Sequence, residues 1–200
     1  MIEIRLLEVA GFASALQALH LPFGKEANSF ASSKSWNIEK KGKVTSTFGE
    51  WCINISEHDE NLLRRLIKAG DEHAKVLRGV VAYLEINAPR YWWVEFDTYR
   101  IGREQLASES TMHIQGKGLS EEELVKMKSE LKEGTMQKRV QMISYQTLRR
   151  IWHQRHRHRL PKWREFCRWM SDHLPYPWLI LGGCKNIVIL IIFYSKYLRN

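Results

Sequence analysis

A run of aromatic and charged residues near the middle of the chain carries the groups best suited to chemistry. It extends from Ala88 to Arg100 and is followed, after seven further residues, by Ser108. Polar groups this dense beside aromatic rings are costly to bury unless each is hydrogen-bonded. Arg100, Gly102 and Ser108 would place a cation and a hydroxyl around a flexible turn, which suits a phosphate. The segment indicates a binding site, and an aromatic core helix followed by a polar loop is the alternative.

A second candidate is the basic run Arg155-His156-Arg157-His158-Arg159. On a helix alternate residues point in different directions, so these side chains cannot form one compact cluster. Arg149, His153 and Arg157 do share a face, at i, i+4 spacing, and that face is a candidate for anion binding. The run is a poor zinc site, because its two histidines diverge on a helix and no third ligand lies nearby.

The positive charge of the chain is concentrated in its last third. The net charge is +9, and residues 135–200 contain thirteen Lys and Arg against two acidic residues. Such a field favours an anionic partner, whether a nucleotide, a nucleic acid or an acidic surface, although a solvated helix face is also consistent with it. Trp152, Trp163 and Trp169 interleave with these cations, so phosphate contacts and base stacking would allow nucleic-acid binding.

The cysteines argue against disulfides, thiolate metal sites and nucleophilic catalysis. Cys52, Cys167 and Cys184 are odd in number, far apart and without a CxxC pair. No Cys or Ser lies in a recognisable nucleophile elbow, and we expect buried core thiols. A reducing cytoplasm fits this usage, and the N-terminus lacks the basic start and apolar run of a signal peptide.

The C-terminus contains an unbroken apolar run, Ile187 to Tyr194. Eight residues are too few for a bilayer core, which needs roughly twenty, so we expect no membrane span. The run is interpreted as a buried terminal strand or an appended tail. The predicted organisation is therefore one domain over residues 1–178 with an apolar tail over 179–200.

Hydrophobic periodicity and turn signals predict alternating strands and helices. Strands are expected at 2–9, 51–56 and 80–86. Helices are expected at 11–21, 61–69, 89–99, 120–132 and 163–170, and from 135 onward through the basic stretch 145–157. Residues 24–49 are polar and predict a long loop or a mobile hairpin.

The stretch from His73 to Ser108 resembles the centre of a known family, the flavin-dependent thymidylate synthases (ThyX). In that family a His opens the central segment, a strand leads into a helix that carries a Gln, and the signature Arg-His-Arg precedes a Ser by seven residues. Here His73 and the strand lead to Thr98-Tyr99-Arg100 and, at the same spacing, Ser108. Lys138-Arg139 and Thr147-Leu148-Arg149 are similar to later pieces in the same order. The resemblance covers roughly residues 1 to 170.

The resemblance implies an α+β fold, a single domain in which helices flank a mixed sheet. It also implies a homo-oligomer, a tetramer, that binds FAD and dUMP at sites shared between subunits and methylates dUMP to dTMP. Residues expected beside the flavin are His73, Arg100, Thr147, Arg149 and His153. Residues expected beside the nucleotide are Glu95, Ser108, Ser110 and Arg139. In this scheme Arg139 and Ser108 hold the phosphate, by charge and by a hydrogen bond.

The chain departs from the family at several signature positions. Thr98 and Tyr99 stand where the family has Arg and His, Glu95 replaces Gln, Leu106 replaces an acid, and Ser110 replaces Arg. Loss of an Arg removes a fixed charge and up to five donors. Three hypotheses therefore stay open: a divergent nucleotide- and FAD-binding enzyme, a basic nucleic-acid-binding protein without enzymatic activity, and an inactive member of the fold that serves as a scaffold.

Overall fold

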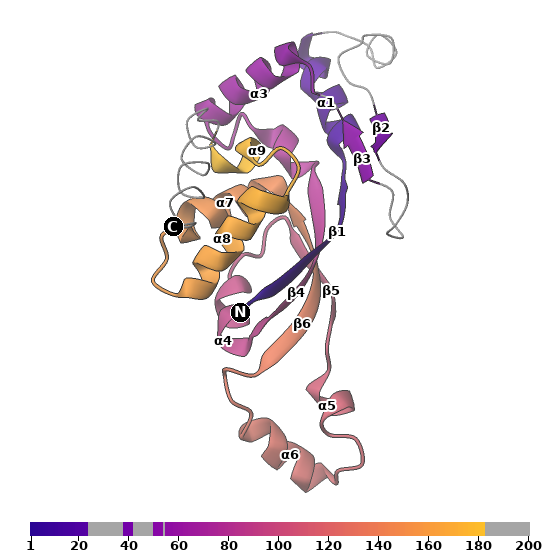
Figure 1. Cartoon of the computed structure of the whole chain (residues 1–200), viewed down its shortest axis with the longest axis vertical. Helices are drawn as coiled ribbons and strands as arrows, with labels where there is room; N and C mark the ends of the chain where they lie inside the picture. The colour runs from indigo at the N-terminus through magenta and orange to yellow at the C-terminus, as the bar shows by residue number, and fades with distance from the viewer. Residues whose placement is uncertain (24–37, 42–49, 54, 183–200) are drawn as a thin grey trace, which may run out of the picture.

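The centre of the molecule is a four-stranded sheet in the order β1-β4-β6-β5. The computed structural model describes residues 1–23, 38–41, 50–53 and 55–182 (Figure 1). The strands are β1 (Glu3–Ala10), β4 (Val81–Pro89), β6 (Met136–Ser144) and β5 (Arg103–Ser108), and a separate hairpin pairs β2 (Ile38–Lys41) with β3 (Glu50–Ile53). The predicted α+β class is confirmed. Each pairing in the larger sheet is antiparallel, where a mixed sheet was expected.

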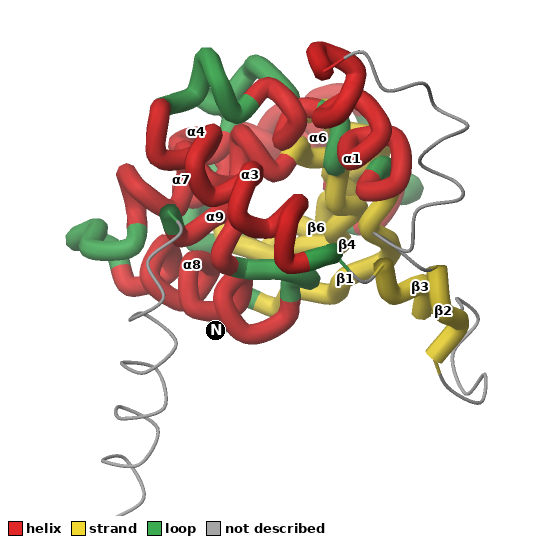
Figure 2. Tube along the Cα trace, turned by 90° about the horizontal axis from the view of Figure 1, so that it is seen from above, coloured by secondary structure: helices red, strands yellow, loops and turns green. Residues whose placement is uncertain are grey.

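Most of the helices lie on one side of this sheet (Figure 2). They are α1 (Phe12–His20), α3 (Glu57–Ala69), α4 (Arg90–Phe96), α5 (Thr111–Ile114), α6 (Glu121–Ser129), α7 (Tyr145–Arg155), α8 (Pro161–His173) and α9 (Trp178–Leu181), with short 3-10 turns η1 (Leu21–Phe23) and η2 (Lys75–Arg78). The exception is the segment between β5 and β6, residues 109–135, which carries α5 and α6 away from the sheet (Figure 1). We call this segment the arm.

The core forms between the sheet and the helices because β4 alternates. Its inward residues Ala82, Leu84, Ile86 and Ala88 are fully buried, whereas the residues between them are partly exposed. Helix α4 packs its aromatic side chains against this face and against α8. The rings in contact are Trp92, Trp93, Phe96, Trp163 and Phe166, with centroids mostly 4.8–6.2 Å apart. Aromatic burial of this kind dominates the stability of a core.

Helix boundaries follow the signals expected from the sequence. Ser120 and Glu123 form the predicted capping box of α6, and Gly70 ends α3 as predicted. Ser144 caps α7, because its hydroxyl accepts the Thr147 N–H. Helix α4 begins at Arg90, one residue after its predicted start, because Pro89 is the N-cap residue. It ends at Phe96, and α6 ends at Ser129, in each case several residues before the expected end.

The prediction of helix from residue 135 onward is wrong for its first ten residues. Met136 to Ser144 form β6, which pairs with β4 along its whole length. The physical reason is a period of two, in which Gln137, Arg139 and Gln141 face the helices and the residues between them face away. Similarly, residues 103–108 form an edge strand and not the expected flexible turn.

The C-terminal part of the described chain belongs to the core. In α9, Leu179, Ile180 and Leu181 are buried, so the packed domain continues beyond residue 178. The apolar run 187–194 and most of the expected loop 24–49 lie outside the described residues. Within the described part of the chain, none of the helices has the length and apolar character that a membrane span requires. Cys167 is buried, as expected, while the side chains of Cys52 and Cys184 are outside the description.

Candidate functional site

A polar cluster lies where the helix-covered face of the sheet reaches its β5 edge. It consists of Asp97, Arg103, Gln105, Ser108 and Arg139, and we call it the β5–β6 cluster. Residues that are directly opposite on antiparallel strands point to the same face. Arg139 is opposite Ser108 on β5 and opposite the fully buried Ile86 on β4. The cluster therefore continues the core-facing surface, at the point where the helices stop covering it.

Asp97, at the C-terminal end of α4, connects the two arginines of the cluster. Its Oδ1 lies 3.1 Å from Nη2 of Arg103, and its Oδ2 accepts from Nη1 of Arg139 at 3.0 Å. Each guanidinium also lies over an aromatic ring, Arg139 over Trp93 at 4.5 Å and Arg103 over Phe96 at 5.2 Å. Cations that stack on rigid core rings are fixed in position before any ligand arrives.

The remaining nitrogens of both arginines have partners within the chain. Arg103 donates from Nε to the Tyr99 carbonyl and from Nη1 to Gln141. Arg139 donates from Nε and Nη2 to Gln137 and from Nη1 to Gln105 as well as Asp97. Their side chains are only 11% and 16% exposed, whereas that of Asp97 is 42% exposed. A ligand from solvent would thus meet Asp97 and Gln105 first.

The structure brings together two of the four residues predicted beside a nucleotide, and places a third close by. Ser108 is exposed and lies opposite Arg139, the arrangement that a shared phosphate contact requires. Ser110 follows two residues later, and its hydroxyl caps α5 by accepting the His113 N–H at 3.3 Å.

Glu95, the fourth residue predicted beside a nucleotide, makes its contacts with α7 and α8. Its Oε2 accepts from Arg155 Nη1 at 2.9 Å and from the indole N–H of Trp163 at 2.8 Å. His158 Nε2 lies 3.9 Å from the same oxygen. Arg155 in turn donates to the Tyr99 hydroxyl. This clasp ties α4 to the α7–α8 connection, so the basic run contributes at least one structural cation.

Of the residues predicted beside a flavin, Thr147, Arg149 and His153 lie on α7, and Arg100 lies in the turn bonded to its start. Thr147 is buried in the first turn and donates from Oγ1 to the Ile101 carbonyl at 2.7 Å. This bond fixes the turn that carries Arg100 to the start of α7. Gly102 in that turn has φ +72, and a Cβ there would lie 2.5 Å from Ser144 Oγ. Arg100 itself is exposed, and no described residue pairs with its side chain.

Arg149 and His153 lie one turn apart further along α7, at the corner where the turn of Asp71 and His73 meets the helix. Arg149 Nε is 3.8 Å from Asp71, and its Nη1 reaches the Ile180 carbonyl at 3.5 Å. Burial lowers the pKa of Arg149, and burial together with the Arg149 charge lowers the pKa of His153. His153 is therefore biased toward its neutral form.

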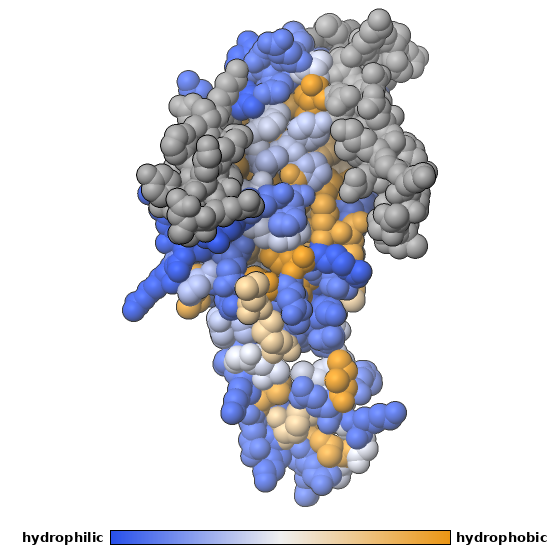
Figure 3. Space-filling model, viewed as in Figure 1, coloured by the Kyte–Doolittle hydropathy of each residue, from blue (hydrophilic) through white to orange (hydrophobic). Residues whose placement is uncertain are grey.

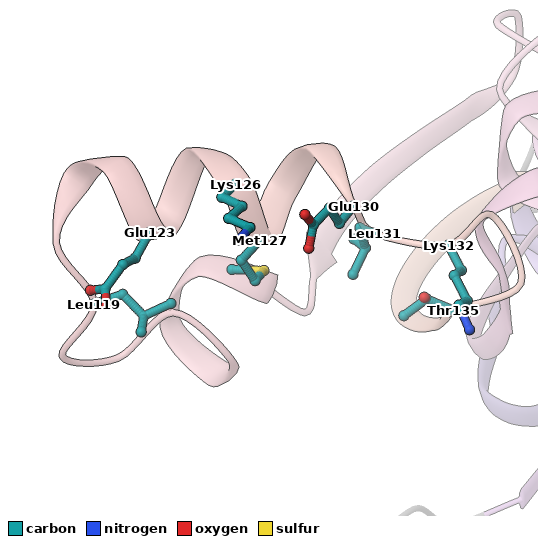
Figure 4. Close-up of a pocket in the computed structure, with 8 residues that line it drawn as sticks. All are labelled: Leu119, Glu123, Lys126, Met127, Glu130, Leu131, Lys132 and Thr135. Atoms are coloured by element: carbon teal, nitrogen blue, oxygen red, sulfur yellow. The ribbon is translucent and has the colours of Figure 1, made fainter.

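A cavity of about 520 Å³ opens beside His73. Helices α1 and α3 supply its apolar walls, and Lys75 and Gly79 lie at its η2 side. A second hollow, of about 430 Å³, lies on the arm between α6 and the segment that follows it (Figure 4). Its lining mixes Leu119, Met127 and Leu131 with charged side chains. Among the described residues, no group of three metal-ligating side chains comes together.

The structure does not support base stacking on all three tryptophans of the basic third. Trp163 is fully buried in the aromatic core and donates to Glu95. Trp152 and Trp169 are partly buried against the core, and each stacks on the histidine four residues later, His156 and His173. The face predicted from Arg149, His153 and Arg157 is interrupted, because α7 ends at Arg155.

The sequence analysis did not predict that Asp97 and three glutamines belong to this site. The glutamines are Gln105, Gln137 and Gln141. The signal that could have found them is the period of two in Arg103-x-Gln105 and in Gln137-x-Arg139-x-Gln141, which is typical of one face of a strand pair. In the helix that was predicted for residues 135–144, side chains two positions apart would point in different directions, so the prediction did not bring them together.

The chain is similar to known proteins in structure but not in sequence. No family model and no curated protein sequence matches the chain. Its structure is similar to that of the flavin-dependent thymidylate synthase ThyX from Helicobacter pylori, complexed with FAD and dUMP, with a TM-score of 0.64 and 14% identity over 92% of this chain and 100% of that one. A second structure of the H. pylori protein with FAD and dUMP gives 0.61 and 15%, over 91% and 97% of the two chains.

A third similar structure is the UMP/dUMP methylase PolB from Streptomyces cacaoi, bound with 5-Br dUMP. Its TM-score is 0.57 at 9% identity, over 86% of this chain and 89% of that one. At these identities the likeness is one of fold. The chain thus has a ThyX-like fold along nearly its whole length.

Proposed function

We propose that the chain binds a pyrimidine nucleoside monophosphate, dUMP or a close analogue, at the β5–β6 cluster. The observation that carries the proposal is the pairing of Ser108 with Arg139 on one face of the sheet, beside a second fixed cation, Arg103. Guanidinium groups and a hydroxyl are the donors that a phosphate monoester prefers. The fold adds support, because proteins of similar structure were solved with dUMP or 5-Br dUMP.

FAD is the cofactor we propose, and cations at and near α7 fit its diphosphate. Arg100 is an exposed cation, Arg149 of α7 lies beside Asp71, and His153 follows one turn later on the same helix. Thr147 fits less well, because its hydroxyl proton is already donated to the Ile101 carbonyl. When bound and reduced, the flavin would supply a hydride for methylation of the pyrimidine.

In this proposal the chain's own residues bind and orient the substrate. Arg139 and Ser108 hold the phosphate and fix the distance of the base from the sheet edge. Arg103 adds a positive charge that the lost signature arginines no longer supply. Fixed, partly desolvated cations of this kind stabilise anionic groups more strongly than mobile surface lysines do.

Cofactor and substrate binding are tested on the purified full-length protein. We expect the protein to keep a flavin absorption spectrum after incubation with FAD and removal of unbound FAD by gel filtration. We also expect a rise in melting temperature with dUMP that exceeds the rise with AMP, the control for phosphate charge alone. Turnover is then tested with reduced flavin and a methylene donor, by following dTMP. A colourless protein with no thermal response to FAD or dUMP would overturn the proposal.

The predicted homo-oligomer belongs to the same proposal. Neither α5 nor α6 has a buried residue, and Met112, Ile114 and Val125 of the arm are exposed. Apolar surface is visible on the arm at the lower end of the molecule in Figure 3. A nine-residue helix gains little stability without packing, and exposed apolar side chains grouped on one projection favour contact with another chain. A second copy of this chain is the partner we propose, as the tetramer expected from the resemblance requires.

A further inference from the structure

The geometry points to Asp97 as an internal anion that occupies the place of a ligand's phosphate between Arg103 and Arg139. We infer that a phosphate oxyanion binds by displacing the Asp97 carboxylate toward solvent. The inference deepens the proposed function, on which it rests for the identity of the nucleotide.

The partners of the two arginines differ in charge. Apart from Asp97 and Gln105, the two arginines donate to one main-chain carbonyl and to the glutamines Gln137 and Gln141, none of which is charged. Asp97 is charged, 42% exposed and bonded to both guanidiniums at once. A carboxylate bridging two guanidiniums presents two oxygens in the way that a phosphate does. It is therefore the partner that an incoming phosphate matches in chemistry and can reach from solvent.

Asp97 lies at the C-terminal end of α4, where a carboxylate is poorly placed. It is the C-cap residue, with φ −68 and ψ −8, and its N–H bonds back to the Trp93 carbonyl. A carboxylate at the C-terminal end of a helix lies against the negative end of the helix dipole, which is unfavourable. The two arginines hold it there. Once a dianionic phosphate takes their charge, the remaining local interactions of the Asp97 side chain favour its release.

Without Asp97, the site would hold two cations close together with no anion between them. Arg103 and Arg139 sit on neighbouring strands, 11% and 16% exposed, and both reach the same carboxylate. Two guanidiniums this close repel each other unless an anion lies between them. Asp97 thus makes the empty site stable, and it also competes with the ligand. Gln105, which is neutral and exposed, cannot replace it in either role.

The test compares Asp97→Ala with the wild-type protein, using inorganic phosphate and dUMP as probes. We expect Asp97→Ala to melt at a lower temperature in phosphate-free buffer and to recover with added phosphate by more than the wild type does. By calorimetric titration we expect phosphate to bind Asp97→Ala at least about fivefold more tightly, the effect of removing the two partly exposed ion pairs that compete with phosphate. Asp97→Asn removes the charge and keeps the shape, so it gives the same comparison if the alanine variant folds poorly.

Glu85→Ala is the matched control. It also removes one carboxylate from an ion pair on the sheet, that with Arg5 at 3.1 Å, but on the opposite face and with a single arginine. Phosphate should not rescue its stability beyond the wild-type response. Equal or weaker phosphate binding by both Asp97 variants, or no phosphate binding by any form, overturns the inference. Failure of the proposed function is a different result, in which phosphate binds Asp97→Ala but dUMP binds it no better than phosphate does.

Discussion

At the scale of single residues, the charge of the site depends on side chains that do not belong to the family signature. Arg100 and Arg139 are the arginines that the resemblance predicts in a site, whereas Arg103 and Asp97 lie outside the signature residues. Because Arg103 and Arg139 stack on core aromatic rings, their positions follow from the packing of α4 rather than from a ligand. The candidate phosphate-binding arginines are thus an extension of the core.

Replacing Arg139 tests the proposed phosphate contact. Arg139→Gln should weaken dUMP binding by about tenfold or more, since a charge-assisted contact to phosphate is worth about 1.5–3 kcal/mol. Isothermal titration measures the change. Arg5→Gln, which removes an exposed cation from the other face, should leave the affinity unchanged, and an equal loss in both variants would indicate only a long-range charge effect.

Replacing Glu95 distinguishes its structural role, the contact with α7 and α8, from the predicted role beside the nucleotide. Because its carboxylate accepts from Arg155 and Trp163, Glu95→Ala should lower the free energy of unfolding by about 2–3 kcal/mol, measured in urea. Its effect on dUMP affinity should be small at temperatures where the variant is folded. Loss of dUMP binding without loss of stability would contradict the structural role and place Glu95 beside the nucleotide.

The buried thiol of Cys167 predicts how the stability of the protein changes at alkaline pH. Burial raises the pKa of its thiol to about 12, whereas the unfolded chain has the ordinary value near 8.5. The unfolded state therefore loses this proton first, and stability falls as pH rises from about 8.5 toward 12, by up to about 1.4 kcal/mol per pH unit. Cys167→Ala should flatten the decline between about pH 8.5 and 10, below the range in which Tyr145 ionises in the unfolded chain. Parallel profiles for the two proteins would show that another group is responsible.

At the scale of elements, the turn that carries Arg100 is held to α7 by the close approach of Gly102. Gly102→Ala should cost about 1–3 kcal/mol of stability, because φ is +72 and the new Cβ would lie 2.5–2.6 Å from the Ser144 and Thr147 hydroxyls. Gly118→Ala is the control, since Gly118 has φ +83 with open space around it. Equal losses in urea unfolding would mean that backbone strain alone, and not the contact with α7, accounts for the effect.

Several elements were predictable from the sequence because their signals are local. The capping box at Ser120 and Glu123, the glycine after α3 and the apolar β4 each depend on residues within a few positions. Strand β6 was not predicted, because its inward positions carry Gln137, Arg139 and Gln141, and polar side chains hide a hydrophobic period. Their polarity is explained only by the cluster across β5, a contact between segments about thirty residues apart.

The candidate site was also predictable only where it did not depend on contacts between distant segments. The pairing of Ser108 with Arg139 was expected from the resemblance, and the register of β5 and β6 places them opposite each other. The clasp of Glu95 and the bridge of Asp97 depend on where α4 ends relative to α8 and β5, which one sequence does not specify. Tertiary context decided which acidic residue faces which arginine.

At the scale of the whole molecule, the packing of the single chain does not explain why the arm exposes apolar side chains. The sheet and its helices bury a continuous core, whereas the arm keeps Ile114 and Val125 63% and 68% exposed and has no buried residue in either helix. The assembly that we propose would give these side chains a partner, and it would also bring a second chain toward the β5 edge, from which the arm extends.

This view predicts a mass in solution of about four times the chain mass of 23.6 kDa, measured by light scattering after size-exclusion chromatography. Replacing both Ile114 and Val125 with Ser should dissociate the assembly, because burial of an aliphatic side chain at an interface contributes about 1.5–3 kcal/mol. Both positions are exposed in the single chain, so the fold of the body, followed by circular dichroism, should persist. Val94→Ser, which alters an equally exposed valine on α4, should leave the mass unchanged. A monomeric wild type, or an arm variant that stays assembled, would remove the arm from the interface and leave the β5–β6 cluster to act within one chain.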